Sequence, residues 1–506
     1  MNEAGIPLLS CLIAWPLLSA MVLGFVHSRQ LAKYLAIIVA AIELLLTLIV
    51  VYRFNPQNET LQLVEQYRWI ELLNIHFEVG IDGISVWFLP CSALLILMLM
   101  LSAWNAVQYF RRLHFALLLA LEGILMGVFC ATDMILFFLF WELTLPAIFF
   151  LIGLWGIGPQ RRGAALKYIL FMLFGSVPLL FAIIMLAINH VTQVGGSIPQ
   201  DLAFSFPVLL LTPVEDSLQP MIFLCLLLGF AVKAPLVPFH TWLPTVSMEA
   251  PTQMTALLIG LKLGLYGILR YAMTLAPSAA VQYSWVLGVF GAVTLIYGAF
   301  IALQQSNLRR LLAYASISHA GLVVIGITSL TMQGIQGALL QLLSFTLVTS
   351  SLVLIAGFIQ NRLGSTDIVH LGGLAKVMPK LSVFYFLFTF ASIGMPGGSS
   401  FPAEFLLMLG ALTSHPSLGI TALVGALMCA AYSLSFARRA FLGQIVHKGV
   451  AQLQDLRPRE FALLCIPALL VLLLGFFPDV ILESHRVTAE AWLSRLVNQP
   501  IFNVTE

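Results

Sequence analysis

Four charged residues stand inside long apolar stretches of this sequence. They are two acids and two bases, Glu142, Lys233, Lys262 and Glu404. Each would cost about 2.5 to 3.5 kcal/mol at the centre of a bilayer, so the four together would cost on the order of 10 kcal/mol if they faced lipid. Because burial raises the pKa of a carboxyl and lowers that of an ammonium, both approach the range in which they exchange protons. The set predicts a buried proton relay, and for any single member the alternative is a structural ion pair or neutral acid.

Two histidines extend this candidate relay. His319 lies in an apolar stretch among small residues that leave room for water, and His240 follows a proline-rich interruption. Imidazole titrates near neutral pH, although a lone histidine in an apolar helix is more often a packed core residue. The relay interpretation is favoured because Lys262 and Glu404 need an intermediate between them.

Further polar residues in apolar stretches are secondary candidates. Glu122 fits either a relay or a structural role, whereas Glu43, which has no basic neighbour nearby, is better interpreted as structural. Ser344 and Thr346 belong to a polar run that could hold water. Small hydroxyl residues in a membrane span are as often helix-packing residues.

Two of the charged stretches are interrupted. Pro235 and Pro238 follow the first lysine closely, and Pro396 and Gly397 precede the last glutamate. Proline removes a backbone donor and clashes with the preceding turn. Irregular backbone at membrane depth is tolerated where protein encloses it or where it lines a cavity, and paired broken helices indicate a transport site. The alternative is a pair of packing kinks.

These residues must be positioned by membrane helices. Of the 506 residues, 60% are hydrophobic and only 9% are charged, which is too apolar for a soluble fold. We expect an all-α polytopic membrane protein without strands. About fourteen spans are predicted to begin near Leu8, Leu31, Ile84, Leu113, Met134, Ala164, Met221, Thr255, Trp285, Leu311, Ala338, Leu381, Ala422 and Phe461.

The predicted spans fall into four regions. Residues 1–112 hold spans one to three, 113–272 and 285–441 form two inverted five-helix repeats, and 461–506 hold the last span and a tail. The tail over 483–497 is expected to be an interfacial helix. The segment 203–211 is too short to cross and is expected to pack on the surface of the bundle.

Basic residues mark alternate connections between the spans. They include Arg29 with Lys33, Arg111 with Arg112, Arg161 with Arg162 and Lys167, Arg309 with Arg310, Arg362 with Lys376 and Lys380, and Arg438 through Arg459. That side is predicted to be cytoplasmic, which places both termini outside. The stretch 8–26 has no small-residue cleavage site, so we expect it to remain as the first span.

Other functions are excluded by composition and pattern. The formal net charge of +2 is spread through loops, so no nucleic-acid surface is indicated. The six cysteines lie singly, without a C-x-x-C pair, and no metal or redox centre is expected. No G-x-G-x-x-G motif follows a strand, so we expect no NADH, flavin, quinone or other cofactor in this chain.

Several motifs give the chain a family resemblance along nearly its whole length. They are Ile81-Asp82-Gly83-Ile-Ser, Phe140-Trp141-Glu142-Leu, Ala231-Val-Lys233-Ala-Pro235 with Phe239-His240-Thr-Trp242-Leu-Pro244, Glu249-Ala-Pro251-Thr252, Leu311-Leu-Ala-Tyr314-Ala-Ser-Ile-Ser-His319 and Gly394-Met-Pro396-Gly397 with Glu404-Phe405. The sequence resembles the antiporter-like subunits of complex I (NADH:quinone oxidoreductase), most closely the NuoM (ND-four) type. Mrp cation/proton antiporters and NDH complexes contain related subunits.

This resemblance implies roles for the charged residues. It implies that Glu142 in span five pairs with Lys233 in span seven, that Lys262 is the middle of the relay and that Glu404 hands the proton outward. His319 matches the histidine of span ten. Movement of Glu142 relative to Lys233 would shift protons along the axis. A glutamate at position 404 favours the NuoM type over the NuoL and NuoN types.

The resemblance also implies neighbouring subunits, a transported ion and a cellular location. It implies NuoL-like and NuoN-like neighbours, membrane lipid as surroundings, protons as the transported species and a bacterial cytoplasmic (inner) membrane with the termini periplasmic. Thr245 and Ser247 replace residues that the family usually writes as Asp and His, and Phe345 replaces a second histidine. These departures leave open a subunit of a cation/proton antiporter or of an inorganic-carbon uptake complex. A purely structural membrane subunit is the third alternative.

Overall fold

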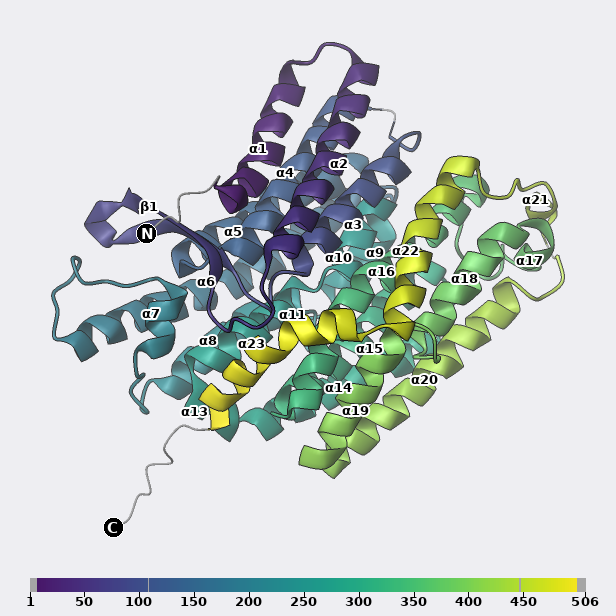
Figure 1. Ribbon diagram of the computed structural model, residues 1–506. Helices are drawn as coiled ribbons and strands as arrows, with labels where there is room; N and C mark the ends of the chain where they lie inside the picture. Colours follow the sequence, from purple (N-terminus) through teal and green to yellow (C-terminus); the bar gives the residue numbers. More distant parts are fainter. Residues whose placement is uncertain (1–6, 108, 446, 498–506) are drawn as a thin grey trace.

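Long helices packed side by side make up most of the computed structural model, which describes residues 7–107, 109–445 and 447–497 (Figure 1). The first half contains α1 (Leu8–Phe25), α2 (Arg29–Arg53), α3 (Phe88–Ala103), α4 (Arg111–Cys130), α5 (Met134–Trp155), α6 (Arg161–Val194), α7 (Phe206–Leu211), α8 (Gln219–Lys233), α9 (Trp242–Glu249), α10 (Thr252–Gly260), α11 (Leu263–Gly267), a π-helical turn (Ile268–Ala272) and α12 (Met273–Leu275). The second half contains α13 (Pro277–Gln282), α14 (Ser284–Leu303), α15 (Leu308–Thr328), α16 (Met332–Leu363), α17 (Leu374–Val377), α18 (Pro379–Ser392), α19 (Ser400–Ser414), α20 (Pro416–Ala440), α21 (Lys448–Ala451), α22 (Pro458–Phe476) and α23 (Asp479–Val497).

The length and apolarity of these helices make the chain a multi-pass membrane protein. Within the described residues, eleven helices are long and apolar enough to cross a bilayer. They are α1, α2, α4, α5, α6, the segment Thr252–Leu275, α14, α15, α16, α20 and α22. The helices α3, α8 and α19 are apolar but shorter. The predicted polytopic membrane fold built mainly of helices is confirmed, and the count of fourteen spans stays a prediction.

Three of the segments that carry charged residues are discontinuous. The helix α8 ends at Lys233, and regular structure resumes only at α9, with Pro235 and Pro238 in the gap. A similar gap separates α18 from α19 and contains Pro396 and Gly397, the latter at φ +93°, a left-handed conformation that glycine adopts readily.

The third discontinuity lies between α10 and α11. Lys262 stands in it, between Gly260 at the end of one helix and Leu263 at the start of the next. The sequence did not lead us to expect this break, because no proline lies within it. The central helix α16, by contrast, is buried along its whole apolar length and contacts α10, α15, α18 and α19.

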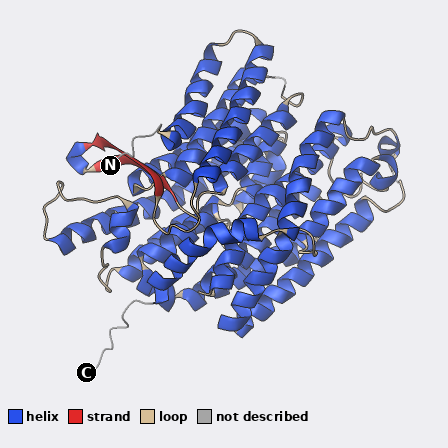
Figure 2. Ribbon diagram, viewed as in Figure 1, coloured by secondary structure: helices blue, strands red, loops and turns tan. Residues whose placement is uncertain are grey.

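A small antiparallel sheet corrects the expectation that the chain has no strands. Strands β1 (Gln62–Ile70) and β2 (Ile75–Ile81) form a hairpin in which Tyr67 pairs with Phe77, drawn in red in Figure 2. The segment between α2 and α3 is too polar to be a helix of the bundle, and in β2 every second residue is β-branched or aromatic. Glu65 of β1 accepts hydrogen bonds from the backbone of Leu9 (2.8 Å) and Ser10 (3.0 Å), which satisfies free N–H groups at the start of α1.

Two short or peripheral segments lie near their predicted positions. The segment predicted over 203–211 contains the six-residue helix α7. The tail forms α23, which crosses the front of the bundle in Figure 1 and packs against α12, α13 and α16. Its inward face includes Ile481, His485 and Trp492, all buried.

Candidate proton relay

The first part of the predicted relay surrounds α5. The Lys233 ammonium donates to Thr144 Oγ1 (2.9 Å) and to the Trp141 carbonyl (3.3 Å), and it lies 3.8 Å from the centroid of the Trp141 ring. The Glu142 carboxylate instead accepts a hydrogen bond from the Ser176 hydroxyl of α6. Glu142 and Lys233 therefore bind different neighbours and make no direct ion pair, although their charges interact through space. Both side chains are half-buried.

The middle of the relay is the break at Lys262. This residue is buried, and its ammonium donates to the hydroxyl of Ser316 on α15. Ser316 precedes His319 by three residues on the same helix, so the two side chains share a face. The gap between Gly260 and Leu263 thus presents the lysine toward the segment of α15 that carries the histidine.

The last part of the relay is a buried cluster around Glu404. The His319 Nε2 atom lies 4.0 Å from Glu404 Oε1, and Gln341 of α16 donates to the same oxygen at 3.2 Å. The Cys429 sulfur lies 3.4 Å from His319 Nε2 and accepts a hydrogen bond from the Tyr432 hydroxyl at 3.1 Å. Two of the predicted residues, His319 and Glu404, are therefore brought directly together.

The secondary candidates are buried but less connected. His240 packs its ring 4.9 Å from that of Tyr297, and its Nδ1 has no hydrogen-bond partner among the described residues. Ser344 is likewise without a partner in this part of the chain, whereas Thr346 donates to a carbonyl of α10 at 3.4 Å. Within the described residues, none of these side chains forms a hydrogen bond with the four charged residues.

Glu43 of α2 and Glu122 of α4 form a separate pair in the N-terminal helices. Both are fully buried, and their carboxylate oxygens have no hydrogen-bond partner among the described residues. They lie close enough for their charges to interact. The structure therefore places Glu122 with Glu43 and not in the series from Lys233 to Glu404.

The three family departures lie in distinct surroundings. The Phe345 ring is 5.5 Å from the His319 ring, so an apolar side chain takes the place beside the histidine. Thr245 accepts a hydrogen bond from Lys167 at 3.0 Å, and Ser247 donates to a carbonyl in the first turn of α15 at 3.0 Å. The two small hydroxyls thus serve local contacts near the start of α15 and α6.

Sequence analysis missed several side chains that hold the relay residues in place. These are Thr144, Ser176, Ser316, Gln341, Cys429 and Tyr432. Ser316 carried a signal, because it stands one helical turn from His319 in the motif that runs from Leu311 to His319. The others are single polar residues in apolar helices, and only the packing of those helices shows which charge each one meets. Within the described residues, no group of three or more His, Cys, Asp or Glu side chains is arranged to hold a metal ion.

The sequence and the fold together define a family. The chain belongs to the NADH:quinone oxidoreductase/Mrp antiporter transmembrane family, whose model matches residues 131–429. That range includes Glu142, Lys233, Lys262, His319 and Glu404.

Individual relatives are similar along nearly their full length. The chain is 32% identical over 499 residues to NADH-quinone oxidoreductase subunit M of Rickettsia prowazekii, covering 96% of this chain and 98% of the relative. It is 35% identical over 513 residues to NAD(P)H-quinone oxidoreductase chain 4 1 of a Synechococcus strain, covering 98% and 94%. Its fold matches a chain of respiratory complex I from Thermus thermophilus with a TM-score of 0.88 and 29% identity, covering 96% and 99%. The chain is thus an antiporter-like membrane subunit.

Proposed function

We propose that this chain translocates protons across a bacterial inner membrane as the NuoM-like subunit of a complex I-like NADH:quinone oxidoreductase, with both termini periplasmic. One observation carries the proposal. Lys262 binds Ser316, which stands one turn from His319, and the His319 ring lies 4.0 Å from Glu404. Buried titratable groups thus follow one another from Lys262 in the first half of the chain to Glu404 in the second, as a proton path requires.

The contacts around α5 would couple movement of Glu142 to the loading and release of a proton on Lys233. Lys233 has neutral hydrogen-bond partners, while Glu142 is held by Ser176 at a distance beyond direct ion pairing. A carboxylate that approaches a buried ammonium favours its charged form, and one that leaves favours loss of the proton. Movement of Glu142 between Ser176 and Lys233 would therefore load the lysine and then release its proton toward Lys262.

The proposal includes partners and an energy source outside this chain. Relatives are named subunits of NADH-quinone oxidoreductases, and the structural match is a chain of respiratory complex I. The half-buried state of Glu142 and Lys233 fits a neighbouring NuoL-like or NuoN-like subunit that covers them. Oxidation of NADH elsewhere in the complex would drive the movement of Glu142, with no cofactor in this chain.

Substitution of the two residues at α5 tests the relay. Lys233→Ala and Glu142→Ala should abolish proton uptake into inverted membrane vesicles during NADH oxidation, while native gels show an assembled complex. Lys376→Ala is the matched control, because Lys376 is an exposed lysine of α17. Translocation at the wild-type rate in both relay variants would show that the relay assignment is wrong.

A second candidate function is a subunit of a cation/proton antiporter or of an inorganic-carbon uptake complex. The family description covers Mrp antiporters as well as quinone oxidoreductases, and Thr245, Ser247 and Phe345 depart from the usual pattern. Native purification followed by mass spectrometry separates the candidates. Copurified NADH-dehydrogenase subunits support the first function, whereas Mrp or carbonic-anhydrase-like partners support the second.

A further inference from the structure

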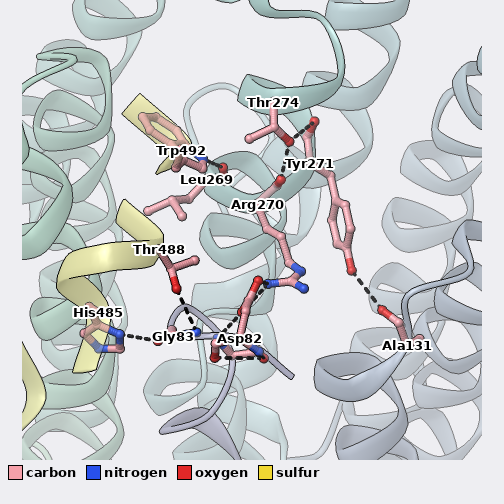
Figure 3. A network of polar contacts seen from close by, with 11 residues as sticks. Asp82, Gly83, Ala131, Leu269, Arg270, Tyr271, Thr274, His485, Thr488 and Trp492 are labelled. Atoms are coloured by element: carbon pink, nitrogen blue, oxygen red, sulfur yellow. Dashed lines mark hydrogen bonds and ion pairs between the residues drawn. The ribbon is translucent and has the colours of Figure 1, made fainter. Parts of the chain in front are cut away.

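A buried ion pair outside the relay joins the π-helical turn after α11 to the loop after β2. Arg270 stands in the π-helical turn, and one terminal nitrogen donates to both carboxylate oxygens of Asp82 at 2.7 Å (Figure 3). The arginine side chain is 1% exposed. Its Nε and second terminal nitrogen have no hydrogen-bond partner among the described residues. The guanidinium charge is thus only partly satisfied.

The C-terminal helix α23 holds both sides of this pair. Thr488 accepts a hydrogen bond from the Gly83 N–H at 3.1 Å, and the His485 ring contacts the Gly83 carbonyl. Trp492 donates to the Leu269 carbonyl at 2.9 Å, next to the arginine (Figure 3). Burial lowers the pKa of His485 to about 4, so this ring is neutral near pH 7 and adds no positive charge beside Asp82.

A cavity leads from the surface to this ion pair. Its volume is about 360 Å³, and its walls include the exposed residues Glu59, Thr60 and Arg495 as well as the buried Asp82 and Arg270. The β hairpin and α23 form much of its wall, on the side of the bundle that the proposed orientation makes periplasmic. Water therefore has room to reach the guanidinium from that side.

The relay residue Lys262 lies earlier in the same segment and does not line the cavity, whereas Arg270 does. Lys262 precedes Arg270 by eight residues, which corresponds to about 12 Å along a helix. Between them stands Tyr266, whose buried hydroxyl has no partner among the described residues and whose ring centroid is 5.9 Å from the guanidinium carbon. The ring of Tyr266 packs against Phe88 and Phe129 at 5.2 and 5.0 Å. Arg270 thus stands between the cavity and the segment that leads to Lys262.

The remaining groups around the guanidinium are mostly aromatic. The rings of Phe206 and Tyr271 lie 5.3 and 5.7 Å from its central carbon, and the cavity wall contains the acids Glu59 and Glu78 besides Asp82. Arginine stays protonated in proteins, so no reaction step removes this charge. A fixed positive charge in a narrow passage excludes protons and other cations.

We propose that Arg270, held by Asp82, is an electrostatic barrier that stops protons from passing between Lys262 and the periplasmic cavity. The barrier rests on the proposed function, since it is needed only if Lys262 carries protons. It allows the first half of the bundle to load protons from one side while remaining closed to the other. Asp82 fixes the arginine in the passage and cancels part of its charge, which limits how strongly it disturbs the relay.

The expected effect follows from the charge. A unit charge about 5 Å from a proton's path, at an effective dielectric constant of about 20, reduces the proton's probability by roughly two powers of ten. The nearby Asp82 offsets part of that repulsion. We therefore expect removal of the charge to raise passive proton conductance at least about ten-fold.

The test measures the passive proton leak through the complex while no NADH is oxidised. The whole purified complex is placed in liposomes that contain a trapped pH-sensitive dye, and a potassium diffusion potential is applied in the absence of NADH. Arg270→Gln should leak at least about ten-fold faster than wild type, whereas Arg270→Lys, which keeps the charge, should stay near the wild-type rate. Asp82→Asn should not leak, because the guanidinium remains.

Two further variants exclude a merely structural effect. The double variant Asp82→Asn with Arg270→Gln leaves no unpaired buried charge, so it provides the measurement if the single variant does not assemble, and it should leak. Adding Lys262→Met to the leaking variant should close the leak, because the path then lacks its lysine.

The outcomes separate the two proposals. A tight membrane with Arg270→Gln or with the double variant overturns the barrier, as does an equal leak in Arg270→Lys and Arg270→Gln. A leak that persists in the Lys262→Met combination also overturns it. NADH-driven pumping is measured on the same liposomes, and its absence in wild type counts against the proposed function independently of the leak.

Discussion

Shortening or neutralising Glu404 should have very different effects on translocation. In Glu404→Gln the side chain keeps its length but cannot titrate, so we expect proton translocation to fall by at least about 100-fold, the lower range for loss of a general acid–base group. In Glu404→Asp the carboxyl withdraws by about 1.5 Å, one carbon–carbon bond. Its separation from His319 Nε2 would then grow from 4.0 Å to about 5.5 Å, and the 3.2 Å hydrogen bond from Gln341 would be lost.

The loss of that hydrogen bond sets the size of the milder effect. A net contribution of about 1 kcal/mol corresponds to about a five-fold change in rate, so the aspartate variant should keep a measurable fraction of translocation. Proton uptake into inverted vesicles is recorded with a pH-sensitive dye and divided by the rate of NADH oxidation, with native gels to confirm assembly. If the two variants translocate equally well, the reasoning that Glu404 hands on a proton is refuted.

Three other substitutions probe the same cluster. His319→Ala should reduce translocation only partly, because water can bridge from Ser316 to Glu404, and a complete loss in the vesicle assay would contradict this. Gly394→Ala should impair translocation, since Gly394 has φ +75° and an added Cβ would clash with Glu404 Oε2. Gly163→Ala is its control, because a Cβ there meets nothing within 4 Å, and it should match wild type in the same assay. Phe345→His places a second titrating ring beside His319 and should raise the residual rate of His319→Ala, measured as vesicle proton uptake; no gain would mean that position 345 does not face the path.

Much of the fold follows from the sequence because the bilayer restricts the choices. Long apolar stretches in lipid must satisfy their backbone groups internally, so α4, α5, α15 and α16 were expected from composition alone. The interruptions near Pro235 and Pro396 were also visible, since proline cannot continue the helical hydrogen bonds. The hairpin of β1 and β2 was missed because it lies outside the apolar stretches, where that restriction does not apply.

The charged residues of the candidate site could be predicted from the sequence, but their hydrogen-bond partners could not. Glu142, Lys233, Lys262 and Glu404 are conspicuous because a charge in an apolar helix is rare. Glu142 accepts a hydrogen bond from Ser176 and does not pair with Lys233. This depends on how α5 and α6 pack, which no pattern of residues in the sequence predicts. The break at Lys262 depends in the same way on packing against α15 and α16 and carries no proline signal.

The contact between the β hairpin and α23 also has a consequence for the order of events during synthesis. The Gly83 carbonyl and its partner His485 are separated by 402 residues. At elongation rates of about 5 to 20 residues per second, roughly 20 to 80 s pass between the making of the first partner and the second. During that interval the loop of Asp82 lacks its contacts with α23. Arg270 is also synthesised before α23. The contacts of α23 with Gly83 and Leu269 are thus among the last to form, and a chain truncated before residue 479 would lack them.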